Sequence, residues 1–179
     1  MFVSFRNRKR LLACLVAFLV IFILALTPPL FPQVQVLDVG QGDAILLRDR
    51  TCTVLIDTGE TDEYDSVIEF LRGENVYRLD LLILTHQHDD HVGEAGDISA
   101  YYPKTRIITN KTESAFSGHR AESAQAGDSF TCGSFAFTVL MADTDDPNEN
   151  NNSLVIYALI GSEKWLFMGD AEKKIESRL

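Results

Sequence analysis

Residues 85–93 read Thr-His-Gln-His-Asp-Asp-His-Val-Gly, and this segment holds three of the four histidines of the chain. It directly follows residues 79–84, a short and largely apolar run that predicts a buried strand. We therefore expect the histidines in the loop at the carboxyl end of that strand, where open sheets place their binding and catalytic groups.

The spacing of these histidines predicts a site for divalent metal ions. His86 and His88 point to the same side of an extended backbone, so one cation can take both imidazoles. Asp90 and His91 follow about one turn later and can face a second ion, displaced by about 3.5–4 Å as in two-metal hydrolytic sites. The alternative is a polar turn that contains histidines by chance, which so dense a cluster of imidazoles disfavours.

Charge is distributed unevenly along the 179 residues, a length that supports one domain and hardly two. Four basic residues lie before residue 11, and no acidic residue precedes Asp38. Residues 28–179 therefore carry all 26 acidic residues and 12 of the 16 basic ones, a net charge of −14. Since no basic run is interleaved with aromatic residues, the sequence predicts no track for nucleic acid.

Residues 11–27 contain no charge and would extend about 25 Å as a helix, close to the lower limit for a membrane span. Three prolines between residues 28 and 32 end the helix, and the basic residues before it favour a cytoplasmic N-terminus. The domain organisation that we expect is a cytoplasmic tail at 1–10, a single-pass anchor in the cell membrane at 11–27, a linker at 28–33 and an extracytoplasmic domain at 34–179.

Two other interpretations of the apolar segment are open. A cleaved signal peptide is the main rival, but the apolar run is longer than usual and no A-x-A site precedes the prolines. A buried core helix is disfavoured, because one small domain can hardly surround a helix that is apolar on every face.

Hydrophobic periodicity after the linker predicts an α/β domain rich in strands. One amphipathic helix is expected at 62–72, with Thr61 or Asp62 as its N-cap, a helical turn at 97–102, and a terminal helix from 170 to 179. The expected strands lie at 34–39, 44–47, 51–56, 81–84, 106–109, 130–140 as a hairpin, 153–160 and 165–168.

The cysteines and one polar loop leave alternatives open. Cys14 lies in the apolar segment as a small hydrophobe, whereas Cys52 and Cys132 flank predicted strands. Export would permit a disulfide between the latter two, and two buried thiols are equally compatible with the sequence. Residues 143–152 form a polar loop, which we expect to be solvated, since it lacks the ligand spacing of a calcium loop.

Four segments resemble the metallo-β-lactamase fold of hydrolases, and more narrowly the branch that includes the extracellular domain of ComEC-type DNA-uptake proteins. They are residues 37–44, 56–59, 85–93, and 152–154 followed by 167–170, and they occur in the order of that family. The resemblance implies an αββα sandwich over residues 34–179.

The resemblance also implies roles for individual residues. His86 and His88 would bind a first metal, Asp90 and His91 a second, and Asp170 would bridge the two. Asp90, which can also orient the attacking water, and His91 would be the catalytic residues. The implied cofactors are two divalent ions, with zinc favoured and manganese the alternative. Support without contact to metal would come from Asp57, Asp38, Asp43, Asn152 and Ser153; a turn before Gly59 is an equally good interpretation of Asp57.

The sequence departs from the wider family at two places. The family supplies another first-metal histidine where this chain reads Asn-Asn-Asn-Ser at 150–153, and His119 is a poor substitute because it precedes the strands at 130–140. A final histidine in a His-His-Gly-Ser segment is also missing, so we expect the domain to be incomplete at its C-terminus.

These features together predict a membrane-anchored, extracytoplasmic, metal-dependent hydrolase. The resemblance implies phosphodiester or related ester substrates, including single-stranded DNA, although the net charge favours a small phosphodiester. The alternatives are a catalytically weak relic that binds metal or a protein partner of unknown kind, and a β-lactamase or lactonase.

Overall fold

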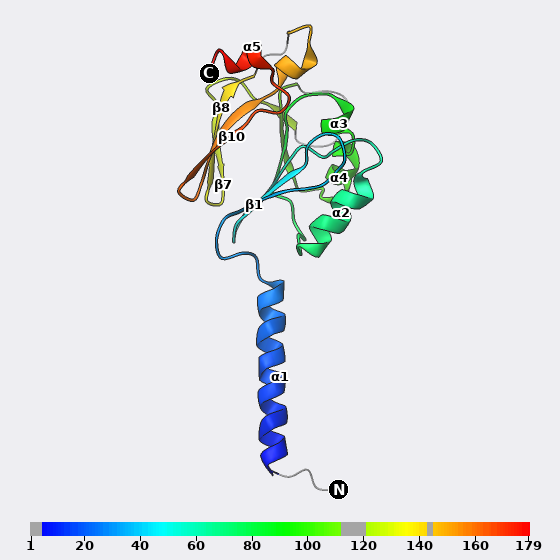
Figure 1. The fold of residues 1–179 in the computed structure, drawn as a ribbon, viewed down its shortest axis with the longest axis vertical. Helices are drawn as coiled ribbons and strands as arrows, with labels where there is room; N and C mark the ends of the chain where they lie inside the picture. Colours follow the sequence, from blue (N-terminus) through cyan, green and yellow to red (C-terminus); the bar gives the residue numbers. More distant parts are fainter. Residues whose placement is uncertain (1–4, 112–120, 143–144) are drawn as a thin grey trace.

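The computed structural model describes residues 5–111, 121–142 and 145–179, and places two β-sheets face to face (Figure 1). Helix α1 (Phe5–Leu26) extends away from the sheets, and the segment after it leads into β1 (Gln33–Val36). Within the described ranges, no helix combines the length and the apolar character that crossing a membrane requires. The anchor expected over 11–27 stays a prediction.

Sheet A is mixed and has the order β1-β2-β3-β4-β5-β6. Strands β1 to β3 pair antiparallel, whereas β3 to β6 pair parallel. The parallel core strands β3 and β4 are buried along their whole length and are nearly continuous runs of Leu, Ile and Val, as parallel strands require. Its members after β1 are β2 (Ile45–Arg48), β3 (Thr53–Ile56), β4 (Leu81–Leu84), β5 (Arg106–Thr109) and β6 (Ala121–Ser123).

Sheet B is antiparallel and has the order β10-β9-β8-β7. Alternation along β8 directs Phe135, Phe137 and Val139 inward, where each is at most 1% exposed. The strands are β7 (Ser129–Cys132), β8 (Phe135–Met141), β9 (Val155–Ile160) and β10 (Glu163–Phe167).

Two apolar clusters hold these layers together. One lies between the sheets and joins Val54, Ile56 and Ile83 of sheet A to Phe137 and Ile156 of sheet B, among others. The other packs the outer face of sheet A against helices α2 (Tyr64–Gly73) and α4 (Ala95–Tyr101). The helices therefore cover one side of the sandwich, and the carboxyl ends of β3, β4 and β5 meet at one edge.

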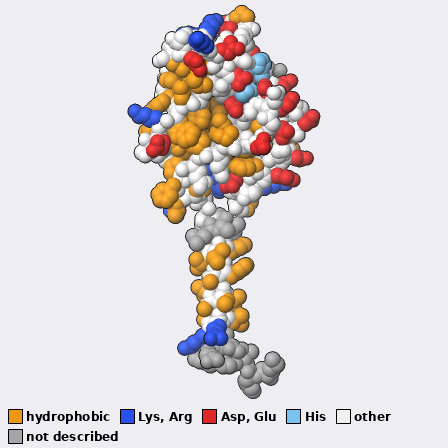
Figure 2. Space-filling view, in the orientation of Figure 1, with side chains coloured by type: hydrophobic (Ala, Val, Ile, Leu, Met, Phe, Trp, Pro, Cys, Tyr) orange, Lys and Arg blue, Asp and Glu red, His pale blue; other side chains and the backbone are white. Residues whose placement is uncertain are grey.

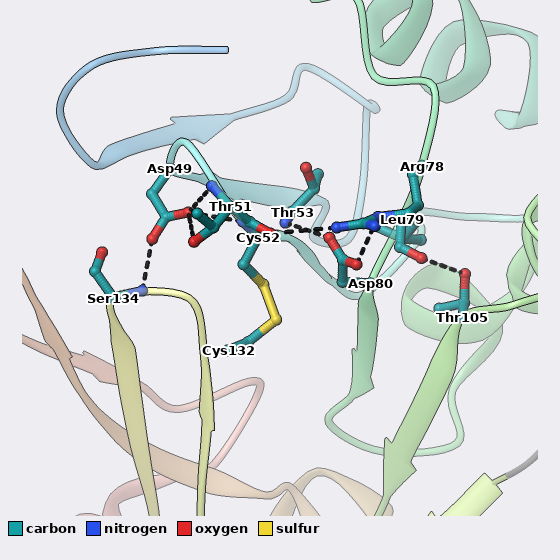
Figure 3. Close-up of a disulfide and its surroundings, with 10 residues drawn as sticks. All are labelled: Asp49, Thr51, Cys52, Thr53, Arg78, Leu79, Asp80, Thr105, Cys132 and Ser134. Atoms are coloured by element: carbon teal, nitrogen blue, oxygen red, sulfur yellow. Dashed lines mark hydrogen bonds and ion pairs between the residues drawn. A yellow bond between two sulfur atoms is a disulfide. The ribbon is translucent and has the colours of Figure 1, made fainter.

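A disulfide between Cys52 and Cys132, with Cα atoms 5.7 Å apart, ties sheet A to sheet B (Figure 3). Beside it, Asp49 Oδ1 accepts hydrogen bonds from the backbone N–H groups of Thr51 (2.6 Å) and Cys52 (2.7 Å), and Oδ2 accepts one from Ser134 (2.6 Å). Burial raises the pKa of Asp49, but these hydrogen bonds outweigh burial and lower the pKa to about 2. Of the two states left open for the cysteines, the structure has the disulfide.

Several elements differ from those expected. The terminal helix expected at 170–179 is a single turn, α5 (Lys173–Glu176), and helix α2 begins after Glu63 without a side-chain cap rather than after Thr61 or Asp62. Three elements were not predicted: β6, helix α3 (Asp89–Val92) and the 3₁₀ turn η2 (Glu149–Asn152). Strand β6 has the polar sequence Ala-Glu-Ser and pairs through its backbone, so it carries no hydrophobic period.

Candidate metal centre

The histidine segment changes direction immediately after β4. His88 keeps an extended backbone, and its carbonyl accepts hydrogen bonds from the N–H groups of His91 and Val92, each at 3.0 Å, which starts helix α3. This turn brings the imidazoles together: the ring centroids of His86 and His91 lie 4.2 Å apart, and those of His86 and His88 lie 4.9 Å apart.

One carboxylate from the far end of the chain joins these rings. The ligand atoms of His86, His91 and Asp170 lie within 4.8 Å of one another, and His91 Nε2 is 3.3 Å from Asp170 Oδ1. Asp170 reaches this position because Gly169 has φ +50°, and a Cβ there would lie 2.8 Å from Thr85 Oγ1. A glycine at 169 is therefore needed for the end of β10 to approach the end of β4.

Asp57 controls the protonation of both buried imidazoles. Its Oδ2 accepts a hydrogen bond from Thr85 Oγ1 at 2.7 Å and is 2.9 Å from His91 Nδ1. Because the Thr85 hydroxyl donates its proton to Asp57, Thr85 Oγ1 can only accept a hydrogen bond from His86 Nδ1, which lies 3.1 Å away. Each imidazole then carries its proton on Nδ1 and presents Nε2 as a lone-pair donor.

The side chains present fit a metal ion. His86 is fully buried, and its Nε2 is a buried atom without a hydrogen-bond partner among the described residues. Burial, together with the neighbouring His91, lowers the pKa of His86 to about 4, so that the ring is neutral near pH 7. A buried, neutral imidazole nitrogen with an unused lone pair, next to a carboxylate, is the donor set that zinc and similar ions take.

The pKa of His91 is shifted in the opposite direction from that of His86. Burial disfavours the charged form of His91, but the hydrogen bond and charge of Asp57, assisted by Asp170 and Asp90, outweigh it and raise the pKa of His91. Burial likewise raises the pKa of Asp57 against the influence of His91. The carboxylates of Asp57, Asp90 and Asp170 thus favour a positive charge at His91, carried either by a proton or by a metal ion.

The other predicted ligands lie nearby but less closely. His88 is exposed and Asp90 is half-buried, and neither joins the group formed by His86, His91 and Asp170. Both act on His86 electrostatically. Gly42 explains the position of Asp90, because a Cβ at Gly42 would lie 1.7 Å from the Asp90 carbonyl oxygen.

The residues expected to support the ligands differ in how close they lie to the histidines and Asp170. Asp43 forms a second group with Asp57 and His91, whose ligand atoms lie within 4.8 Å of one another. Ser153 Oγ accepts a hydrogen bond from the Asp170 N–H at 3.2 Å, and Asn152 is buried close by. Asp38 is exposed and joins neither group. His119 lies outside the described residues.

Sequence reasoning missed the hydroxyl and amide groups around the histidines. Thr85 orients His86, and Gln87 contacts Thr109 Oγ1 and Asn110 Oδ1 at 3.0 and 2.9 Å. A usable signal was present, since Thr109 ends the next parallel strand and Asn110 follows it, and the carboxyl ends of neighbouring parallel strands meet at one edge.

Known proteins share this arrangement of strands. The model of the metallo-beta-lactamase superfamily matches residues 37–178. The chain belongs to the metallo-beta-lactamase superfamily. The His and Asp cluster of this chain is the candidate site for divalent metal ions of such a fold.

Within the superfamily, the chain resembles competence proteins. It is 31% identical to ComE operon protein 3 of Bacillus subtilis over 89% of the chain, and 32% identical to Recombination protein 2 of Haemophilus influenzae over 90% of the chain. It spans 25% and 21% of the lengths of these relatives. It is also 32% identical to a hydroxyacylglutathione hydrolase of Bdellovibrio bacteriovorus, over 70% of the chain and 46% of that protein.

Solved structures agree on the fold. A metallo-beta-lactamase of Cronobacter sakazakii, mutated in its HARLDQ motif, superposes with a TM-score of 0.61 at 14% identity, over 78% of this chain and 64% of that chain. The superfamily fold implied by the resemblance of the four segments is confirmed.

Proposed function

We propose that this superfamily member hydrolyses phosphodiester or related ester bonds with two divalent metal ions. The observation that carries the proposal is the buried Nε2 of His86, which lacks a hydrogen-bond partner among the described residues and lies beside His91 Nε2 and the carboxylate of Asp170. His86 and His88 would hold one ion, Asp90 and His91 the other, and Asp170 both. Bound divalent ions lower the pKa of water and stabilise the negative charge that develops on the scissile group.

The protein groups around the ions have separate tasks in this proposal. Asp57 and Thr85 keep Nδ1 of His91 and His86 protonated, so that both Nε2 atoms face the ions. Asp90 would accept a proton from the attacking water and orient it. The exposed Asp170 and His88 leave the ligand cluster open to solvent on the side from which substrate arrives.

The net charge and the similar proteins together limit the candidate substrates. The resemblance to ComEC-type DNA-uptake proteins makes single-stranded DNA one candidate, whereas a net charge of −14 over residues 28–179 favours a small phosphodiester. A second candidate is a hydroxyacylglutathione, because a hydrolase named for that substrate is 32% identical over 70% of the chain.

Metal content and hydrolysis test the proposal together. Elemental analysis of the purified full chain should find two zinc or manganese ions per chain, and bis(p-nitrophenyl) phosphate should be turned over. His86→Ala and Asp170→Asn should abolish turnover, whereas Gln125→Ala, an exposed glutamine away from the cluster, should not. Nitrocefin, a lactone and S-lactoylglutathione test the other superfamily substrates. Less than one ion per chain and no turnover of any of these would favour a relic that binds a partner.

We also propose that α1 anchors the chain in the cell membrane, with residues 1–10 inside and the domain outside. The proposal is supported by the uncharged segment 11–27 after four basic residues, and by apolar side chains that are exposed from Leu11 to Ile23. A disulfide between the sheets also suits an oxidising compartment. The chain should resist carbonate extraction from membranes, and protease added to spheroplasts should digest the domain; release by carbonate would contradict the anchor.

A further inference from the structure

A chain of buried amide and hydroxyl groups lies directly behind the histidine segment, and the metal cluster does not use it. Gln87 separates His86 from His88 in the sequence, and its Nε2 donates to Asn110 Oδ1 at 2.9 Å and to Thr109 Oγ1 at 3.0 Å. Thr109 and Asn110 are at most 1% exposed. A buried polar network whose groups are hydrogen-bonded rigidifies the segments that it joins.

The chain continues from sheet A into the segment that precedes sheet B. Asn110 Nδ2 donates to the backbone carbonyl of Asn152 at 2.9 Å. Asn152, which is 1% exposed, donates in turn to Glu149 Oε2 at 2.8 Å and to the carbonyl of Asp146 at 3.1 Å. Three segments distant in sequence are therefore connected: the histidine segment, the end of β5 and the turn η2.

Glu149, which accepts from Asn152, also lies 3.2 Å from Nζ of Lys111, the residue after Asn110. At the other end of the network, Gln87 is held by the two hydrogen bonds of its side chain. Downstream, the His88 carbonyl is held by two N–H groups of α3, so the backbone is fixed on each side of His88.

His88 needs such support more than the other two imidazoles. His86 contacts Thr85 and His91 contacts Asp57, but the ring of His88 is exposed and makes no hydrogen bond to another of the described residues. Its position relative to His86 therefore depends on the backbone that carries it. The segment 149–152 also lies where the wider family was expected to supply a further histidine to the same ion.

We infer that Gln87, Asn110 and Asn152 are positioning residues for the first metal: they fix the backbone that carries His88, and thereby place its imidazole beside His86. This inference rests on the proposed two-metal function. In this chain, the segment at 149–152 would support His86 and His88 through its hydrogen bond to Asn110, and it would not contribute a metal ligand itself.

Metal affinity of the full chain tests the inference without recourse to activity. Asn110→Asp keeps the acceptor for Gln87 but removes the donor to Asn152, and Gln87→Ala removes both contacts of the side chain. We expect each variant to lose about 10- to 100-fold in Zn²⁺ affinity, measured by competition with a chromophoric chelator, the range found when groups that orient ligands are removed. The visible absorption of Co²⁺ bound to the site should change in the same variants, and Gln125→Ala should change neither.

The outcomes separate this inference from the function on which it rests. Wild-type affinity and an unchanged Co²⁺ spectrum in Asn110→Asp, with or without a lower unfolding midpoint, would reduce the network to a structural role and overturn the inference. Since Gln87 is only half-buried, Gln87→Ala keeps the test valid even if Asn110→Asp, which puts a carboxylate at a buried position, fails to fold. Absence of metal from the wild-type chain would contradict the proposed function and this inference together.

Discussion

At the scale of single residues, Asp57 matters most, because it orients two of the candidate ligands, His86 and His91. Its buried carboxylate accepts hydrogen bonds from the Thr85 N–H at 2.8 Å and the Thr85 hydroxyl at 2.7 Å, and it is 2.9 Å from His91 Nδ1. It does so from φ +56°, a left-handed conformation that Asp tolerates better than most residues. One side chain therefore fixes the orientation of two imidazoles.

Asp57→Asn should weaken metal binding although it preserves the shape of the side chain. The amide must direct one N–H toward Thr85 or His91, and a His91 that accepts at Nδ1 carries its proton on Nε2, where a metal would bind. We expect a loss of 10- to 100-fold in metal affinity, measured by chelator competition. Asp97→Asn, on the exposed side of α4, is the matched control. Undiminished affinity in Asp57→Asn would show that another group sets the tautomer.

Asp49 should make the stability of the domain depend on pH. Its folded pKa of about 2 lies below the ordinary value of 3.8, so the ionised side chain stabilises the fold above pH 4, and this contribution is lost as the pH falls toward 2. Asp49→Asn should therefore lower the free energy of unfolding by about 2 kcal/mol at pH 7. Urea titrations at pH 7 and pH 2.5 should show this difference shrinking. An equal difference at both values would assign the effect to packing.

At the scale of elements, the sequence predicts those whose apolar pattern is strong. Strands β3 and β4 are continuous apolar runs, and the histidines after β4 lie at the expected edge of the sheet. Helix α3 could not be predicted, because its four residues are mostly polar and it forms on the His88 carbonyl. The contact between Gln87 and Asn110 was missed because it joins residues distant in sequence, and only the shared edge of the parallel strands β4 and β5 indicates it.

The disulfide is a covalent cross-link between the two sheets, and its removal should lower the stability of the domain. Cys52 and Cys132 are 80 residues apart, so the bond restricts a long loop of the unfolded chain. Cys52→Ala combined with Cys132→Ala should lower the free energy of unfolding by about 3 kcal/mol, read from urea titrations. Cys14→Ala, which removes a free exposed cysteine, should leave the value unchanged. A reducing agent should destabilise the wild type and not the double variant.

At the scale of the whole molecule, the histidines lie in an acidic neighbourhood. Figure 2 shows Asp and Glu side chains gathered around the histidines and along the side of the globular part that carries α2 and α4. Helix α3, with the candidate site, lies in the half of the globular part that is farther from α1. The surface around the candidate metal site is therefore negative, and any anion must approach this site against that charge.

This charge distribution predicts how salt affects the proposed phosphodiesterase activity. Repulsion between residues 28–179, with a net charge of −14, and an anionic substrate weakens as the Debye length falls from about 30 Å at 0.01 M to about 8 Å at 0.15 M salt. We expect kcat/KM for a dinucleotide to rise severalfold over this range, and for a 20-nucleotide strand to rise more steeply. A neutral ester such as p-nitrophenyl acetate should show little change. A fall in kcat/KM with added salt would indicate release of counterions from a basic binding track, and would contradict an active site specialised for small substrates.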